Sequence, residues 1–205
     1  MKLGILGGTF DPIHLGHLII AEHVRMELGL EKVLLIPTGQ PWMKENLKIS
    51  EGSHRLAMVN LATASNPHFD VSSMEVDRLG ATHTVDTLEI IHREATESLD
   101  LYFILGVDSL LNINRWHEAA KIFSLCTIAA VDRPGFAEPD LSLLDTISVG
   151  LSLQVRRVQG LLIEISGTEL RRDVAREASI KYRVPLEVEE YIYANGLYKK
   201  ERSHE

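Results

Sequence analysis

The sequence predicts an α/β protein with a doubly wound, mainly parallel sheet and helices on both faces. Three observations support this prediction. Apolar runs of strand length alternate with amphipathic runs of helix length along most of the chain. The first apolar run leads into a glycine-containing loop that opens a helix. The chain has 205 residues, which is enough for one α/β domain with a sizeable core.

The expected strands are short aliphatic runs bounded by polar or glycine-containing segments. In chain order, five runs and a weaker sixth fit this description: Lys2–Leu6, Val33–Ile36, Phe69–Ser72, Leu101–Leu105, Thr127–Val131 and the weaker Leu161–Ile165. Because helical segments separate them, right-handed βαβ crossovers are expected, and these make neighbouring strands parallel. The pattern is typical of a Rossmann-like fold.

The expected helices are segments in which apolar residues recur every three or four positions. They are His17–Leu28, His54–Ser65, Thr84–Arg93, His117–Phe123, Glu169–Ala178 and Leu186–Ala194. Gly29 and the pair Asn66 and Pro67 act as stop signals for the first two. No repeat or linker interrupts the series, so residues 1–198 are predicted to form one domain, followed by a polar tail at 199–205.

Composition excludes several classes of protein. The formal net charge of −8 argues against broad binding to nucleic acid or acidic membranes, so neither is an expected partner. No run of 18 uninterrupted apolar residues is present, which makes a spanning helix improbable. The single cysteine, Cys126, cannot form an intrachain disulfide and is expected to be an inert core residue. A reducing, cytoplasmic location fits this cysteine usage.

The loop after the first strand carries the strongest functional signal. It reads Gly-Gly-Thr-Phe-Asp-Pro-Ile-His-Leu-Gly-His over residues 7–17. Glycines let the backbone approach a ligand, and a helix start offers N–H groups to an anion. Imidazoles suit phosphate oxygens. A lone Gly-Gly turn or a lone histidine is more often structural, but together these residues predict a nucleotide-phosphate site that includes Gly7, Gly8, Thr9, Phe10, His14 and His17.

Ligands of open parallel sheets bind at the carboxyl ends of the strands, where the strand order reverses. The segment from Gly106 to Ser109 follows the fourth strand and would line the same crevice as the first loop. The loop lacks the G-x-G-x-x-G fingerprint of dinucleotide-binding oxidoreductases, which argues against a redox enzyme.

Two motifs carry a resemblance to a known superfamily. The pattern G-G-T-F-D-P-x-H-x-G-H resembles the signature of the nucleotidyltransferases named for their H-x-G-H motif. Residues 165–171, Ile-Ser-Gly-Thr-Glu-Leu-Arg, resemble the I-S-x-T-x-x-R motif of adenylyltransferases, with Gly167 where serine is more frequent. Alone, this second segment would be a capped helix with a surface arginine. The resemblance implies that Ser166, Thr168 and Arg171 hold a triphosphate.

Further segments narrow the resemblance to one family. They are Pro37–Lys44, Thr82–Leu88, Arg115–His117, Arg133–Gly135 and Val184–Tyr198. Together they resemble bacterial nicotinate-nucleotide adenylyltransferases from Leu3 to Tyr198. The family often has Pro-His-Lys where this chain has Trp42, Met43 and Lys44, so only the lysine is carried over.

The resemblance implies adenylyl transfer from ATP to nicotinate mononucleotide, which gives deamido-NAD and pyrophosphate in NAD biosynthesis. The expected chemistry is in-line attack without a covalent enzyme intermediate. The implied catalytic residues are His14, His17 and Arg171. Gly106 and Asp108 join the other ATP-binding residues, and Lys44, Thr84, Trp116 and Arg133 bind nicotinate mononucleotide. Mg²⁺ is expected on the substrate phosphates rather than in a protein cage, and Asp11 is expected to form the turn.

Other readings stay open. Phosphopantetheine adenylyltransferases share both end motifs but are shorter and carry threonine at the position of His14. Glycerol-phosphate cytidylyltransferases have a different C-terminal motif. A non-catalytic nucleotide sensor could retain the fold, although intact His14, His17 and Arg171 argue against it. A homo-oligomer also stays open.

Overall fold

The computed structural model describes residues 1–39, 49–132 and 140–199. Its centre is a six-stranded sheet in the order β3-β2-β1-β4-β5-β6, in which every neighbouring pair is parallel. The strands are β1 (Lys2–Gly8), β2 (Lys32–Pro37), β3 (Phe69–Val71), β4 (Asp100–Gly106), β5 (Thr127–Val131) and β6 (Val155–Val158). Strand order reverses between β1 and β4, which confirms the predicted doubly wound, Rossmann-like α/β fold.

One predicted strand is wrong. Leu161–Ile165 forms no strand, and the sixth strand is instead Val155–Val158, which pairs with β5. Arg156 and Arg157 are exposed, as is common on an edge strand, where charged side chains discourage pairing with other chains. The aliphatic run was misleading because its apolar side chains serve another purpose: Leu161 and Ile163 line a cavity beside the first helix.

The predicted helices are present, the last with its predicted ends and the others with shifted ends. They are α1 (Leu15–Leu28), α2 (Gly52–Thr63), α3 (Thr84–Glu94), α5 (Ala119–Leu125), α6 (Gly167–Ala175) and α7 (Leu186–Ala194). The start predicted at His117 moves to Ala119 because Glu118 has a left-handed backbone with φ 49°. Among the residues that the structure describes, a one-turn helix, α4 (Val107–Leu110), and the 3₁₀ helices at Ile113–Arg115, Leu141–Thr146 and Leu151–Gln154 are too short to leave a periodic pattern.

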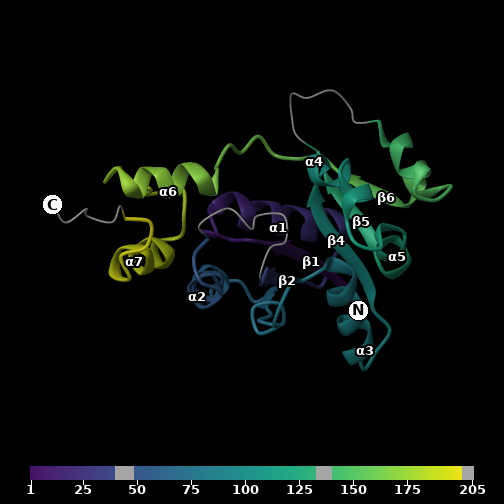
Figure 1. Cartoon of the computed structure of the whole chain (residues 1–205), viewed down its shortest axis with the longest axis horizontal. Coiled ribbons are helices and arrows are strands. Elements are labelled where there is room, and N and C mark those ends of the chain that lie inside the picture. The colour runs from purple at the N-terminus through teal and green to yellow at the C-terminus, as the bar shows by residue number, and fades with distance from the viewer. Residues whose placement is uncertain (40–48, 133–139, 200–205) are drawn as a thin grey trace.

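Each face of the sheet is covered by its own set of helices. One apolar cluster joins the sheet to α1, α2, α6 and α7, and the other joins it to α3 and α5 (Figure 1). Successive strand residues alternate between the clusters, so Ile5 faces α3 while Leu6 faces α1. Cys126 lies in the second cluster as expected, and burial raises the pKa of its thiol to about 12. No helix of the described residues is long and apolar enough to cross a membrane.

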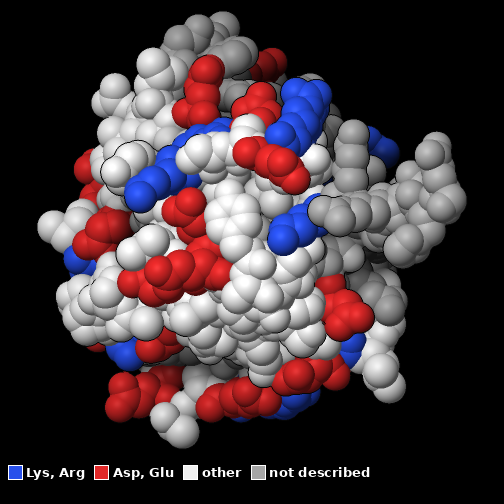
Figure 2. Space-filling view, turned by 90° about the vertical axis from the view of Figure 1, so that its left-hand side faces the viewer, with Lys and Arg blue, Asp and Glu red and all other residues white. Residues whose placement is uncertain are grey.

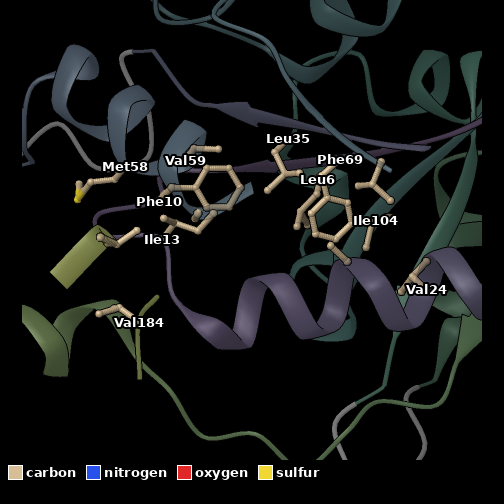
Figure 3. Close-up of a cluster of buried hydrophobic side chains, with 14 of the residues drawn as sticks. Leu6, Phe10, Ile13, Val24, Leu35, Met58, Val59, Phe69, Ile104 and Val184 are labelled. Carbon is tan, nitrogen blue, oxygen red and sulfur yellow. The ribbon is translucent and has the colours of Figure 1, made fainter. Parts of the chain in front are cut away.

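The loop between β1 and α1 is anchored in the first cluster. Phe10 and Ile13 extend from this loop toward Met58 and Val59 of α2, beside Val184 (Figure 3). Phe10 is 2% exposed and Ile13 is fully buried. The hydrophobic core therefore fixes the loop that the sequence identifies as the functional one.

A buried arginine joins the loop after β1 to two parts of the connection between β2 and α2. Arg55 of α2 is 2% exposed. Its guanidinium donates to the carbonyl oxygens of Thr9 at 2.8 Å, Ser50 at 2.9 Å and Gly39 at 3.0 Å. These carbonyls belong to segments without regular structure, so a planar fork of donors satisfies acceptors that strand pairing leaves open.

We expect Arg55→Met to lower the free energy of unfolding by about 3 kcal/mol, because three buried carbonyls lose a charged donor. Urea denaturation measures the change. Lys32→Met is the matched control, since the Lys32–Asp70 ion pair is 2.8 Å long but its side chains are 43% and 50% exposed. That control should cost less than about 1 kcal/mol. Equal losses in both variants would contradict the structural role of Arg55.

Candidate active site

The two histidines of the first loop stack on each other at the start of α1. The ring centroids of His14 and His17 are 3.6 Å apart with an interplanar angle of 21°. The backbone N–H of His14 donates to Nδ1 of His17 over 3.3 Å. In the neutral His17 ring the proton therefore lies on Nε2, which can donate to a ligand. Phe10 packs its ring edge-on against His17 at 5.0 Å.

His14 lies beneath His17 and is almost fully buried, at 6% exposure. Burial lowers the pKa of His14 from 6.5 to about 4, so its ring is neutral near pH 7. Its Nδ1 has no hydrogen-bond partner among the described residues. A Cβ on Gly16 would lie 3.1 Å from this nitrogen, so the glycine of the H-x-G-H motif makes room for the buried ring.

Two cavities meet at the switch point between β1 and β4. We call them the α3 cavity, of about 210 Å³, and the α1 cavity, of about 430 Å³. Both are lined by Gly7, Phe103 and Trp116. Trp116 is half-buried and packs edge-on against Phe103, with centroids 6.0 Å apart. One aromatic pair thus separates two adjoining spaces, each open to a different part of the first loop.

The α3 cavity is lined by residues that the sequence predicts as ligands and by others that it does not. Gly8, Thr9, Thr84 and Trp116 are the predicted members, and Thr84 is the first residue of α3. Glu75 is an unpredicted member. It is 8% exposed and accepts a hydrogen bond from the Thr87 hydroxyl at 2.7 Å, and burial raises the pKa of its carboxyl.

Two histidines also line the α3 cavity without having been predicted. His83 and His117 face each other with ring centroids 4.6 Å apart. Both lie inside motifs that carry the family resemblance, and each is adjacent to a predicted site residue. Their neighbours in sequence were the only signal that could have identified them, because neither shows a pattern of its own.

The α1 cavity is lined by three further predicted nucleotide contacts, while His14, Ser166, Thr168 and Arg171 line neither cavity. The three that line it are His17, Gly106 and Asp108. Gly106 ends β4, and Asp108 lies in the first turn of α4. Leu161 and Ile163 close one side, which explains their apolar character outside the sheet. Phe10 lines neither cavity, so a ligand contact at this residue would come from its backbone.

The second motif lies against the first loop. Ser166 precedes α6, and Thr168 and Arg171 lie on the helix. Arg171 donates from Nη1 to the Asp11 carbonyl at 2.6 Å and from Nη2 to the Thr168 hydroxyl at 3.3 Å. The fold therefore brings together two motifs whose contacting residues are 160 positions apart.

The surface around this end of the molecule is acidic. Figure 2 views the end that carries α6 and α7, and Asp and Glu are more prominent there than Lys and Arg. An anionic ligand must therefore find local donors rather than a broad basic patch. Arg171 and the start of α6 are such donors.

The remaining predictions concern a bound metal ion, the positively charged side chains of Lys44 and Arg133, and the role of Asp11. Among the described residues, no group of three or more His, Cys, Asp or Glu side chains could hold a metal ion. Lys44 and Arg133 lie outside the described residues. Asp11 contributes to the turn, but its carboxylate also accepts hydrogen bonds from two residues distant in sequence, the Tyr198 hydroxyl and the Ser50 N–H.

Comparison with known proteins identifies the family. The model of the cytidylyltransferase-like family matches residues 5–173. A probable nicotinate-nucleotide adenylyltransferase of Roseiflexus sp. (strain RS-1) is 46% identical over 197 residues, which cover 96% of this chain and 98% of the relative. A probable nicotinate-nucleotide adenylyltransferase of Dehalococcoides mccartyi (strain ATCC BAA-2266 / KCTC 15142 / 195) is 42% identical over 201 residues, covering 98% of each. The chain belongs to the nicotinate-nucleotide adenylyltransferase family.

Solved structures agree on the fold of this family. The nicotinic acid mononucleotide adenylyltransferase of Plasmodium falciparum, complexed with NaAD, matches with a TM-score of 0.77 at 20% identity and covers 96% of this chain and 97% of its own. The same protein complexed with APC gives a TM-score of 0.75. At this identity the match supports the Rossmann-like fold, while the relatives above establish the family.

The buried His14 should make stability depend on pH. Its pKa is about 4 in the folded chain and near 6.5 when exposed, so the unfolded chain binds more protons between these values. Stability is therefore expected to fall as pH drops from about 6.5 to about 4. Urea midpoints measured across this range should fall less steeply for His14→Gln than for the parent protein. Parallel slopes would show that His14 is not buried in its neutral form.

Proposed function

We propose that this protein transfers the adenylyl group of ATP to nicotinate mononucleotide, giving deamido-NAD and pyrophosphate in NAD biosynthesis. The observation that carries the proposal is the pair of adjoining cavities that share Gly7, Phe103 and Trp116 beside His17. Two nucleotides must meet at their phosphates, and this arrangement offers one space for each base and a common boundary. The curated relatives named for this reaction support the same assignment.

The α3 cavity is assigned to nicotinate mononucleotide. Trp116 offers an aromatic face for the pyridine ring. Thr84 begins α3, where unpaired backbone N–H groups favour a carboxylate. Lys44 and Arg133 join the site through the family resemblance, as partners for the mononucleotide phosphate.

The α1 cavity is assigned to the adenosine part of ATP. Gly106 brings backbone close to the ligand at the end of β4, and the carboxylate of Asp108 suits ribose hydroxyls. The triphosphate would then extend toward the first loop and α6. Gly7, Gly8, Thr9 and the backbone of Phe10 line its path, and Ser166, Thr168 and Arg171 bind its far end.

The reaction proceeds by in-line attack in this proposal. A phosphate oxygen of nicotinate mononucleotide bonds to the α-phosphorus of ATP while the bond to pyrophosphate breaks. No protein nucleophile is required, because positioning and charge stabilisation supply the catalysis. His17 donates from Nε2 to the charge that develops on the α-phosphate, and His14 holds the His17 ring through stacking and the backbone N–H. Arg171 offsets charge on the leaving phosphates.

Mg²⁺ fits this scheme as a companion of the substrate. The described residues offer no protein cage for it, and both oxygens of the Asp11 carboxylate already accept hydrogen bonds. When bound to the triphosphate oxygens, Mg²⁺ would neutralise part of their charge.

Loss of the His17 imidazole should reduce turnover by about 10²–10³-fold, because one preorganised donor to the reacting phosphate is removed. The measurement is kcat for His17→Ala with ATP, Mg²⁺ and nicotinate mononucleotide. His23→Ala is the matched control, since His23 lies on the same helix, donates from Nε2 to the Gln159 carbonyl at 2.8 Å, and lines neither the α3 cavity nor the α1 cavity. Near-parental turnover in a folded His17→Ala protein would remove His17 from the mechanism.

Acceptor choice tests the function itself. The helix start at Thr84 presents donors, which suit the carboxylate of nicotinate and leave the amide NH₂ of nicotinamide without an acceptor. We therefore expect the acid mononucleotide to be preferred by at least about 10²-fold in kcat/KM. Trp116→Ala should weaken both acceptors and leave the ratio largely unchanged, since stacking does not distinguish them. Equal efficiency with both acceptors would refute the deamido assignment but not adenylyl transfer.

A further inference from the structure

The C-terminal end of the described chain reaches back to the first loop. The hydroxyl of Tyr198 donates to Oδ1 of Asp11 over 2.7 Å, across 187 residues of sequence. Tyr198 is half-buried, and burial together with the Asp11 carboxylate raises the pKa of its phenol, so the phenol keeps its proton as the donor. This contact lies outside both cavities and outside the residues assigned to the substrates.

The backbone of Tyr198 adopts a conformation that few non-glycine residues use. Its φ is 63°, in the left-handed region, and it follows Gly196 at φ 61°. These two residues turn the chain sharply after α7 and direct the phenol at the first loop. Such a conformation is unfavourable for a residue with a Cβ and persists where surrounding contacts determine it. The Asp11 contact is one that does so.

Asp11 joins three parts of the molecule. It is 6% exposed. Its second carboxylate oxygen, Oδ2, accepts from the Ser50 N–H at 3.2 Å, and its carbonyl accepts from Arg171 at 2.6 Å. Both ends of the carboxylate are therefore held, which restricts the backbone that carries the carbonyl. His14, the buried catalytic candidate, follows only three residues later.

The start of α6 packs closely against the same carbonyl. A Cβ on Gly167 would lie 3.2 Å from the Asp11 carbonyl oxygen and 3.6 Å from Nη1 of Arg171. The glycine at this motif position thus allows the helix to approach Asp11. A shift of the Asp11 peptide would consequently move both the acceptor that orients Arg171 and the contact surface of α6.

We propose that Tyr198 is a positioning residue for adenylyl transfer: through Asp11 it fixes the loop that presents His14 and the carbonyl that orients Arg171. The inference rests on the proposed function in assigning Arg171 to the triphosphate. Tyr198 itself touches no substrate. Its removal should therefore change ATP binding and turnover, while the nicotinate mononucleotide site in the α3 cavity stays intact.

The chain contains a matched control for this inference. Tyr191 of α7 is also half-buried, and its hydroxyl hydrogen-bonds Nδ1 of His54 on α2 at 2.9 Å. Tyr191→Phe thus deletes a tertiary tyrosine hydrogen bond between the same C-terminal region and the body of the protein. It leaves the Asp11 network untouched. A purely structural role for Tyr198 would make the two phenylalanine variants behave alike.

The test compares both variants by steady-state kinetics and by calorimetric titration with Mg²⁺-ATP. Tyr198→Phe should lower kcat by roughly 10- to 100-fold, weaken ATP binding, and leave KM for nicotinate mononucleotide within about twofold. Tyr191→Phe should keep parental kinetics at a similar melting temperature. Asp11→Asn should resemble Tyr198→Phe, and the double variant should lose less than the sum of the two, because both changes break one network.

Three results would overturn the inference. The first is parental kcat and ATP affinity in Tyr198→Phe, and the second is an equal loss in Tyr191→Phe. The third is full additivity with Asp11→Asn. Failure of the proposed function looks different, since the parent protein would then form no deamido-NAD. The ATP titration still decides the role of Tyr198 in that case, because it needs no acceptor.

Discussion

The buried guanidinium of Arg55 is the constraint on which the arrangement of the site depends. The loop after β1 and the connection between β2 and α2 leave three carbonyls that no strand pairs, and one planar side chain satisfies them together. A buried charge is costly unless every donor has a partner, so this network favours a single arrangement of the loops. Burial lowers the pKa of Arg55, and the charge of nearby Asp11 opposes that change.

The hydrophobic core also restricts the loop between β1 and α1. Phe10 and Ile13 are packed against α2, so the backbone from Phe10 to His14 has little freedom. His14, which follows Ile13 directly, is buried as well, and burial lowers its pKa and keeps its ring neutral near pH 7. Burial in this part of the chain therefore sets the protonation state of a catalytic candidate. A looser core would admit water to His14 and return its pKa toward the ordinary value.

Local patterns predicted the interior of the fold. The strands β1, β2, β4 and β5 are aliphatic because helices cover both of their faces, and continuous aliphatic runs can be recognised in a sequence. β6 was missed because an edge strand tolerates Arg156 and Arg157, while the nearby aliphatic run lines a cavity. The short α4 and the left-handed Glu118 depend on tertiary packing, which no local pattern records.

The residues of the site also differ in how far the sequence could predict their arrangement. The glycines and histidines of the first loop are adjacent in sequence, and the structure brings them to the switch point. The resemblance implied that Arg171 holds the triphosphate, but it did not predict the contact between Arg171 and that loop. The partners of Asp11 could not be predicted, because Ser50 and Tyr198 are 39 and 187 residues away. Tyr198 ends a segment that carries part of the family resemblance, but the resemblance gave neither residue a role. Only the folded chain shows that this aspartate is more than a turn residue.

Asp11 also presents an electrostatic difficulty that the fold resolves. In the proposed function a triphosphate approaches the loop that contains this carboxylate, and like charges would repel each other there. Both oxygens accept hydrogen bonds from neutral donors, the Tyr198 hydroxyl and the Ser50 N–H, and the Arg55 guanidinium lies close enough to interact with the charge. The carboxylate is thus held inside the protein, and the part of Asp11 that meets Arg171 is its carbonyl. An acidic protein can in this way bind an anion with a few fixed donors, provided that the carboxylate among them stays turned inward.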